Sequence, residues 1–342
     1  MMTEKIFKAI WYTKDSSNYF YLILLISISL LPLSLIFFLL IHIRSMLYKF
    51  GLKKVYKSSI PVVIIGNYLV GGQGKTPLTI MLSKYLIDKG MTVGIVSSGY
   101  KSQIKMPHKV NKDSDPYLVG DEAVMLAQMT DALIVSGSSR VNATKMLERD
   151  NVDLIIHDDG LEHLALSRDF ELIVEKNQVL ANTVSDKFKF CSLLPSGPYR
   201  RPKFWREGVN KKLHVSLKYE YENVFNPASK TLSSLKDFEN KTVRLVTGIA
   251  FPEIIQSGLE QKNILVRSTI YGDHHTFSES DIIFNDSLPI FVTMKDYVKL
   301  DKFDIKNVWV IQPIPILSES LDILFKNIID LTKDENKGNY SS

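Results

Sequence analysis

Short apolar runs alternate with segments of helical periodicity along most of the chain after residue 60. Leu78, Met81, Leu82, Tyr85 and Leu86 recur at the spacing of one helix face, and a second helix is expected near Asn142–Arg149. The strands are expected at Pro61–Ile65, Met91–Val96, Ala132–Val135, Val152–Ile156 and Glu171–Val174. Strands separated by helices of this length predict an α/β fold, with a mostly parallel sheet covered by helices on both faces.

A polar stretch near Glu220–Asn240 marks a predicted boundary, and a second, smaller α/β unit follows it. A helix from Pro252 and a closing helix near Leu321–Leu331 are expected there. The strands of this unit are expected at Thr242–Val246, Ile264–Tyr271, Ile290–Thr293 and Val308–Ile311. We therefore predict an N-terminal membrane anchor over residues 1–45, a core domain over 46–240 and a smaller α/β domain over 241–342.

The N-terminal part of the chain carries a strongly apolar segment, in which the 23 residues from Tyr19 to Ile41 hold no charge. As a helix they would extend about 34 Å, enough to cross a hydrocarbon core of about 30 Å. The run is too long for a signal peptide, and it is apolar on every side, unlike a buried soluble helix. Pro32 lies within the run, so the segment either spans the membrane or re-enters it.

Charge places this segment relative to the rest of the protein. The 342 residues carry a net charge of +5, but the first 60 alone carry +6. Five cations and no acid lie between Arg44 and Lys57, which predicts that the body that follows is cytoplasmic. A nucleic-acid partner is not expected, because the folded body lacks the basic face that such proteins carry. The single cysteine, Cys191, excludes an internal disulfide.

A glycine-rich loop follows the first strand and precedes a helix. It runs Gly66-Asn-Tyr-Leu-Val-Gly-Gly-Gln-Gly-Lys-Thr-Pro77. This order is typical of a phosphate-binding P-loop, in which Lys75 reaches the β- and γ-phosphates and the Thr76 hydroxyl binds Mg²⁺. The loop departs from the Walker pattern, since Leu69 stands where glycine is expected. The predicted nucleotide-binding residues are Leu69, Val70, Gly71, Gly72, Gln73, Gly74, Lys75 and Thr76.

Acidic residues at the end of another strand supply the second part expected of such a site. Asp158 and Asp159 follow the apolar run Val152–Ile156, and ligands of open α/β sheets bind at that edge. One aspartate would serve Mg²⁺ and the other would orient the acceptor, and the pattern leaves their division of roles open. Asp121 and Glu122 begin a predicted helix, so a favourable helix N-terminus is the alternative to a functional role for them. The predicted metal ligands are Thr76, Asp158 and Glu122.

Two histidines follow a strand of the second unit. Asp273, His274 and His275 could form a metal site or supply a base, and polar surface residues are the alternative. The stretch Pro198–Arg206 is basic and aromatic, which suits a membrane interface or an anionic group as well as a solvated loop.

The ordered set of motifs resembles the tetraacyldisaccharide 4′-kinase family, the lipid A 4′-kinases of Gram-negative bacteria. The resemblance rests on Gly66-Asn67, Val70–Pro77, Ser97–Tyr100, Val119–Glu122, Asp158–Gly160 with His163, Arg168-Asp169, Leu194–Pro198, Thr247–Ile249, Asp273-His274 and Thr293–Asp296. It implies transfer of the γ-phosphoryl group of ATP, with Mg²⁺, to the 4′-hydroxyl of a tetraacylated glucosamine disaccharide 1-phosphate. It also implies that this occurs at the cytoplasmic face of the inner membrane, and that Asp121 and His274 act as a base pair.

With Lys75 and Asp159, Asp121 and His274 are the predicted catalytic residues. An acylated disaccharide lipid and the membrane are the expected partners, and no protein partner is evident. The chain departs from the family's usual Arg, Gly, Gln, Glu and Glu at Ser98, Lys101, Glu162, Arg201 and Met294, so we predict a divergent but active kinase. The alternative is a membrane-tethered P-loop ATPase or GTPase switch without a lipid acceptor.

Overall fold

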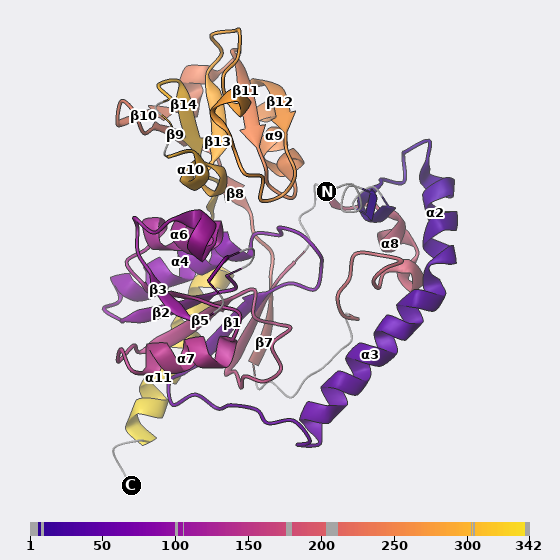
Figure 1. Ribbon diagram of the computed structural model, residues 1–342, viewed down its shortest axis with the longest axis vertical. Coiled ribbons are helices and arrows are strands. Elements are labelled where there is room, and N and C mark those ends of the chain that lie inside the picture. The colour runs from indigo at the N-terminus through magenta and orange to yellow at the C-terminus, as the bar shows by residue number, and fades with distance from the viewer. Residues whose placement is uncertain are drawn as a thin grey trace.

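Two sheets form the body of the molecule, and a long helical arm extends from it (Figure 1). The computed structural model describes residues 6–7, 10–99, 102–104, 106–175, 180–202, 211–301, 303 and 305–338. The first sheet has seven strands in the order β3-β4-β2-β5-β1-β6-β7. They are β1 Val62–Gly66, β2 Val93–Ser97, β3 His108–Val110, β4 Leu133–Ser136, β5 Leu154–Asp158, β6 Phe170–Val174 and β7 Lys211–Val215. All pair in parallel except β3, which is antiparallel to β4.

Helices cover both faces of this sheet, so its central strands are buried along their whole length. The helices are α4 Lys75–Asp88, α5 Pro116–Val119, α6 Asp121–Met129 and α7 Arg140–Glu148. Leu78 and Leu82 of α4 pack in one core, while Ala143 and Leu147 of α7 pack in another. The predicted fold class is therefore confirmed, and the carboxyl ends of β1, β2 and β5 meet at one edge of the sheet.

The second sheet has six strands in the order β10-β9-β14-β13-β11-β12. They are β9 Asn223–Asn226, β10 Thr231–Ser234, β11 Thr242–Thr247, β12 Leu265–Ile270, β13 Ile290–Thr293 and β14 Val308–Ile311. Helices α9 Pro252–Glu260 and α10 Met294–Leu300 accompany them. The predicted boundary at residue 240 stays a prediction, and β9 and β10 precede it although they belong to this sheet.

The chain passes twice between the two sheets. Strand β8 Tyr219–Glu220 leads outward and pairs antiparallel with β15 Ile314–Pro315, which leads back. Helix α11 Glu319–Gly338 then packs on the first sheet's core through Phe325 and Ile328. Helix α11 continues well past Leu331, where the sequence predicted its end.

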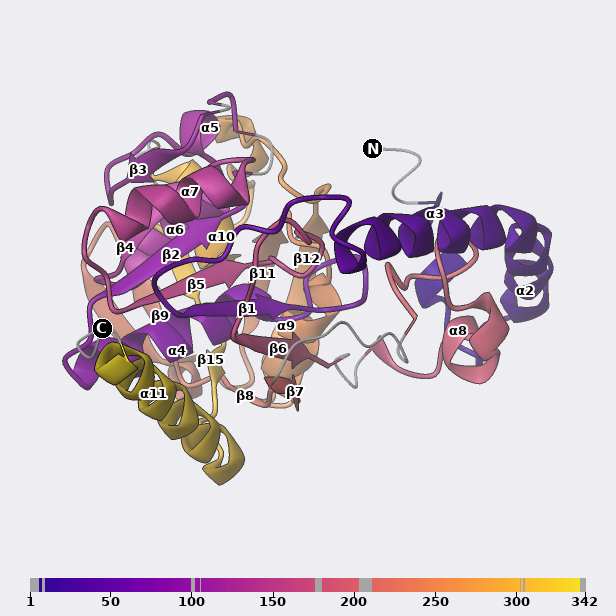
Figure 2. The ribbon, with the colours of Figure 1, turned by 90° about the horizontal axis from the view of Figure 1, so that it is seen from below.

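The apolar N-terminal segment forms the arm, which extends to one side of the body (Figure 2). It consists of α2 Phe20–Ser29 and α3 Leu31–Lys49, which follow one another with a bend at Leu30. Pro32 lies in the first turn of α3, where a residue without an N–H is tolerated. The short helix α8 Val184–Lys187, which is followed by η2 Lys189–Cys191, lies beside α2. Of the described helices, α3 is long and apolar enough to cross a membrane.

Candidate active site

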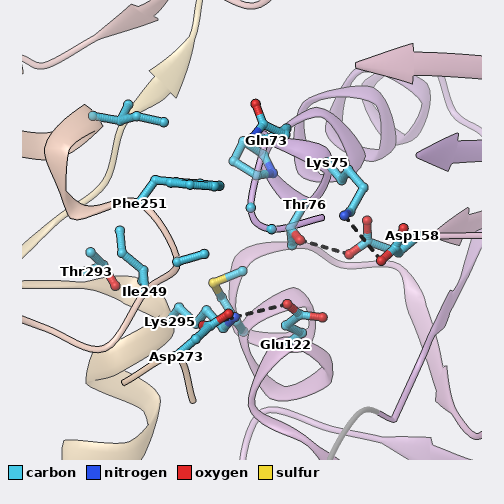
Figure 3. A pocket seen from close by; sticks show the side chains of 18 of the residues that line it. Gln73, Lys75, Thr76, Glu122, Asp158, Ile249, Phe251, Asp273, Thr293 and Lys295 are labelled. Carbon is cyan, nitrogen blue, oxygen red and sulfur yellow. Dashed lines mark hydrogen bonds and ion pairs between the residues drawn. The ribbon is translucent and has the colours of Figure 1, made fainter. Parts of the chain in front are cut away.

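A cavity of about 830 Å³ opens between the carboxyl edge of the first sheet and the second sheet. In Figure 3, Gln73, Lys75, Thr76 and Asp158 lie on one side of it, and Ile249, Phe251 and Thr293 lie on the other. Trp11, which precedes the arm, also lines the cavity. Most predicted site residues thus share one cavity, although their elements are far apart in the sequence.

The glycine-rich loop joins β1 to α4 and has the backbone conformation that its glycines allow. Gly71 and Gly74 have φ angles of +104° and +96°. A Cβ on Gly71 would lie 2.5 Å from the Phe251 ring, so glycine is needed there for space as well as for conformation. Helix α4 begins at Lys75, and the partial positive charge of its N-terminus faces the cavity. Anionic phosphate groups fit this arrangement.

Not every predicted loop residue faces the cavity. Val70, Gly71, Gly72, Gln73, Gly74, Lys75 and Thr76 line it. Leu69 instead packs its side chain in the core with Tyr199, to which its backbone also bridges. The leucine that departs from the Walker pattern thus serves packing.

Asp158 at the end of β5 is held directly beneath the loop. Its carboxylate accepts hydrogen bonds from Thr76 Oγ1 at 3.0 Å and from Thr79 Oγ1 at 3.1 Å. Burial, Glu122 and Asp159 raise its pKa to about 6. This excess of buried negative charge is what a divalent cation would neutralise, so Thr76, Asp158 and Glu122 fit Mg²⁺ as one hydroxyl and two carboxylates. When bound, Mg²⁺ would neutralise phosphate charge.

Asp159 turns away from Asp158 because its backbone is left-handed, with φ +53°. Its carboxylate lies 3.2 Å from Lys75 Nζ and 3.4 Å from Arg200 Nη1. Burial alone would raise its pKa, but Lys75 and Arg200 lower it to about 2. Lys75 also donates to Asn67 Oδ1 at 3.3 Å, so the lysine of the loop is held by both neighbours.

Asp121 of α6 and His274, which follows β12, form a pair; His274 lines the cavity, whereas Asp121 is buried and is not one of the lining residues. His274 Nδ1 lies 2.9 Å from Asp121 Oδ2, and its backbone N–H donates to the Gly248 carbonyl. Burial alone would raise the pKa of Asp121, but the hydrogen bond from His274 and the charges of Lys295 and Lys299 hold it well below its usual range. A proton on Nδ1, donated to Asp121, leaves Nε2 with its lone pair.

The neighbouring histidine serves another purpose. His275 Nε2 lies 3.2 Å from Asp281 Oδ2, and its ring stacks on Tyr271. The two histidines therefore do not converge on one point. Within the described part of the chain, no group of three or more His, Cys, Asp or Glu side chains forms a metal site.

Three cations near the site were not predicted from the sequence as functional residues. Arg140 of α7 is buried, and its guanidinium donates to the carbonyls of Val96, Asp158 and Asp159. Lys299 of α10 lies 3.6 Å from Asp121 and 3.4 Å from Asp296, and Lys295 contacts Glu122. Lys295 belongs to the motif Thr293–Asp296, whereas Lys299 lies beyond it and no motif pointed to Lys299.

The departures from the family pattern fall around the same cavity. Ser98 and Met294 line it. Arg201, which is buried, donates through Nε to Glu162 Oε1 at 3.0 Å, so two of the departures are partners of each other. Lys101 and residues 203–206 of the basic loop lie outside the described part of the chain.

A phosphate loop that shares a cavity with the histidine of an Asp–His pair is the arrangement expected of a P-loop kinase. Comparison with known proteins gives the particular one: the family model for tetraacyldisaccharide-1-P 4′-kinase matches residues 26–329. The chain belongs to this family.

Individual relatives agree with the family match. Tetraacyldisaccharide 4′-kinase from Ruthia magnifica is 35% identical over 298 residues, which cover 84% of this chain and 92% of that protein. The one from Nitrosococcus oceani is 33% identical over 87% of both. Among solved structures, LpxK from Aquifex aeolicus in complex with ATP has a TM-score of 0.71 at 23% identity. The match covers 90% of this chain and 99% of that one and shows that the fold is shared.

Proposed function

We propose that this kinase transfers the γ-phosphoryl group of ATP to the 4′-hydroxyl of a tetraacylated glucosamine disaccharide 1-phosphate. The observation that carries the proposal is the Asp121–His274 pair, because its histidine lines the same cavity as the phosphate loop. A sugar hydroxyl has a high pKa, so its proton must leave as the phosphate bond forms. A phosphate loop alone would not need such a base.

Each residue has a role that follows from its position. His274 Nε2 accepts the proton of the hydroxyl while Asp121 stabilises the imidazolium that forms. The O–H bond breaks as the new O–P bond forms, and the bond from the γ-phosphorus to the bridging oxygen breaks to leave ADP. Lys75 stabilises charge on the transferring group, and Asp159 positions Lys75.

The arm supports an association with the membrane in which both of its ends stay on the same side of the bilayer. Before the arm, Tyr12 donates a 2.7 Å hydrogen bond to the Val70 carbonyl of the phosphate loop. Near its other end, Arg44 donates to the Glu162 carbonyl at 3.0 Å. Both ends thus contact the same body, which suits a helix that lies in one leaflet better than a spanning one. Its exposed leucines and isoleucines would enter the lipid on the cytoplasmic face, where an acylated substrate is held.

ATP consumption by the purified protein, with and without the detergent-solubilised disaccharide lipid, tests the function. A kinase phosphorylates the lipid in proportion to the ATP consumed. The alternative, a membrane-tethered switch, would hydrolyse ATP without the lipid, and the family match does not favour it. Phosphate release that is independent of the lipid, with no labelled lipid product, would contradict the proposal.

The position of the arm is tested by labelling. Tyr19→Cys and Leu52→Cys lie at its two ends and are well exposed, whereas the native Cys191 is buried. In inverted inner-membrane vesicles, an impermeant maleimide should label both variants if the arm stays in the cytoplasmic leaflet. Labelling of Tyr19→Cys only after the vesicles are opened would mean that the arm crosses.

A further inference from the structure

Lys295 of α10 is held in a cage of three partners at the domain interface. Its Nζ lies 3.2 Å from Glu122 Oε1 and 3.5 Å from Asp273 Oδ1 (Figure 3). It also lies 3.1 Å from His274 Nε2. Glu122 comes from the first sheet's side of the cavity, and Asp273 and His274 come from the second. Lys295 itself lines the cavity, as Lys75 does.

The lysine is a cation in this cage. Burial alone would lower the pKa of Lys295, but Glu122, Asp273 and Asp121 raise it above its ordinary value. It therefore donates to His274 and does not compete with it as a base. That hydrogen bond has two consequences: it fixes the imidazole with its lone pair on Nε2, and it occupies the position that the acceptor hydroxyl must take.

The ion pairs of Lys295 in this cage need not persist when ligands bind. Glu122 is one of the carboxylates that fit Mg²⁺, and a carboxylate that binds Mg²⁺ attracts a lysine less strongly. The terminal phosphate of a nucleotide in the loop brings new anionic oxygens into the same cavity. A lysine on a flexible stem can exchange one set of anions for the other.

We propose that Lys295 is a second phosphate-binding cation, which leaves this cage for the terminal phosphate of ATP and thereby uncovers His274 Nε2. This rests on the proposed function for the identity of the phosphate donor. Lys295 keeps its proton throughout; the proton of the acceptor hydroxyl goes to His274. Lys75 and Lys295 then stabilise the transferring group from opposite walls of the cavity.

Nucleotide binding without any lipid gives the first test, because it does not depend on the acceptor. Titration calorimetry with ATP and with ADP, both with Mg²⁺, measures the preference for the terminal phosphate. Lys295→Met should weaken ATP binding about tenfold or more and leave ADP binding within about twofold, and Lys295→Arg should restore most of the preference. Lys112→Met, at an exposed lysine paired with Asp131, is the matched control.

A second variant changes the affinity in the other direction. Asp273→Asn removes one anion of the cage and should tighten ATP binding severalfold, an effect that should vanish in the Asp273→Asn, Lys295→Met double variant. In the lipid assay, Lys295→Met should lower kcat about 100-fold. An unchanged ATP-to-ADP preference in Lys295→Met would overturn the proposal even if kcat fell, since a lysine that only orients His274 would act on kcat alone. A wild-type protein that binds ATP but does not phosphorylate the lipid would refute the function and leave this test intact.

Discussion

Asp121 Oδ2 and His274 Nδ1 lie 2.9 Å apart, although they are 153 positions apart in the chain. Asp121 begins α6 on the first sheet, and His274 follows β12 of the second. The contact joins the two halves of the molecule beside the cavity. The catalysis that we propose for this pair therefore depends on the relative position of the two halves of the molecule as well as on the residues themselves.

Replacing Asp121 tests the proposed role of this pair in proton transfer. Asp121→Asn keeps the shape of the side chain but no longer holds the proton on Nδ1 or stabilises the imidazolium, so kcat should fall about 100-fold or more. The KM for ATP should change little. Steady-state kinetics with the lipid measures both, with Asp131→Asn, at an exposed residue, as the control. Activity close to that of the control would exclude Asp121 from proton transfer.

The space around the phosphate loop gives a second prediction. Gly71→Ala should weaken ATP binding about tenfold or more, because the new Cβ meets both a left-handed backbone and the Phe251 ring. Gly90→Ala is the matched control: its φ is +83°, but a Cβ there meets no atom within 4 Å. Gly90→Ala should lower the melting temperature modestly and leave the ATP affinity unchanged. Equal affinities in both variants would show that the contact with Phe251 does not matter.

The five central strands of the first sheet and the phosphate loop could be predicted from the sequence because local patterns determine them, whereas the edge strands β3 and β7 were missed. Buried parallel strands appear as apolar runs, and their carboxyl ends share one edge, so the loop after β1 and Asp158 after β5 had to meet. The bend at Leu30 also follows a local signal, since Pro32 cannot continue the backbone hydrogen bonds of the preceding helix.

The rest depends on contacts that local patterns do not contain. Only the family resemblance implied that Asp121 and His274 form a pair, because hydrophobic periodicity does not show how two sheets face each other. Strand β9 was missed because it is four residues long and buried only at every second position. Arg140 looks like an ordinary surface cation in the sequence, and only the structure shows that it is buried; the motif that contains Lys295 did not show its partners.

Arg140 should be important for stability as well as for the site. Arg140→Met leaves the carbonyls of Val96, Asp158 and Asp159 without their buried donor, which should lower the free energy of unfolding by about 3 kcal/mol. Urea denaturation measures this. Arg149→Met, at an exposed residue just after the same helix, should cost less than about 0.5 kcal/mol. Equal stability of the two variants would refute the role of Arg140.

His163 should make the stability depend on pH. Burial and the nearby Arg140 lower its pKa to about 4, from 6.5 for the free side chain. The unfolded chain therefore binds this proton first as pH falls, so the stabilisation is complete above about pH 6.5 and is lost between about 6.5 and 4. His163→Gln should remove this loss, which is at most about 3 kcal/mol of the free energy of unfolding between about pH 6.5 and 4. The raised pKa of Asp158 changes the stability in the opposite sense over the same pH range. The free energy of unfolding of the variant is therefore compared with that of the wild type at each pH by urea titration. A difference between the two proteins that does not change with pH would contradict the lowered pKa of His163.

Arg201 and Glu162 should compensate each other. In the family resemblance these positions usually carry glutamate and glutamine, and here the two departures form one ion pair that is half-buried on the Glu162 side. Arg201→Glu alone places a second carboxylate beside Glu162 and removes the hydrogen bond that Arg201 donates to the Leu161 carbonyl. Both changes should lower the free energy of unfolding. Adding Glu162→Gln removes the repulsion and should recover part of the loss, with a coupling energy of about 1–3 kcal/mol in a double-mutant cycle measured by urea denaturation. If the two substitutions were simply additive, the departures would be independent, and the reversed charge at position 201 would need an explanation outside this pair.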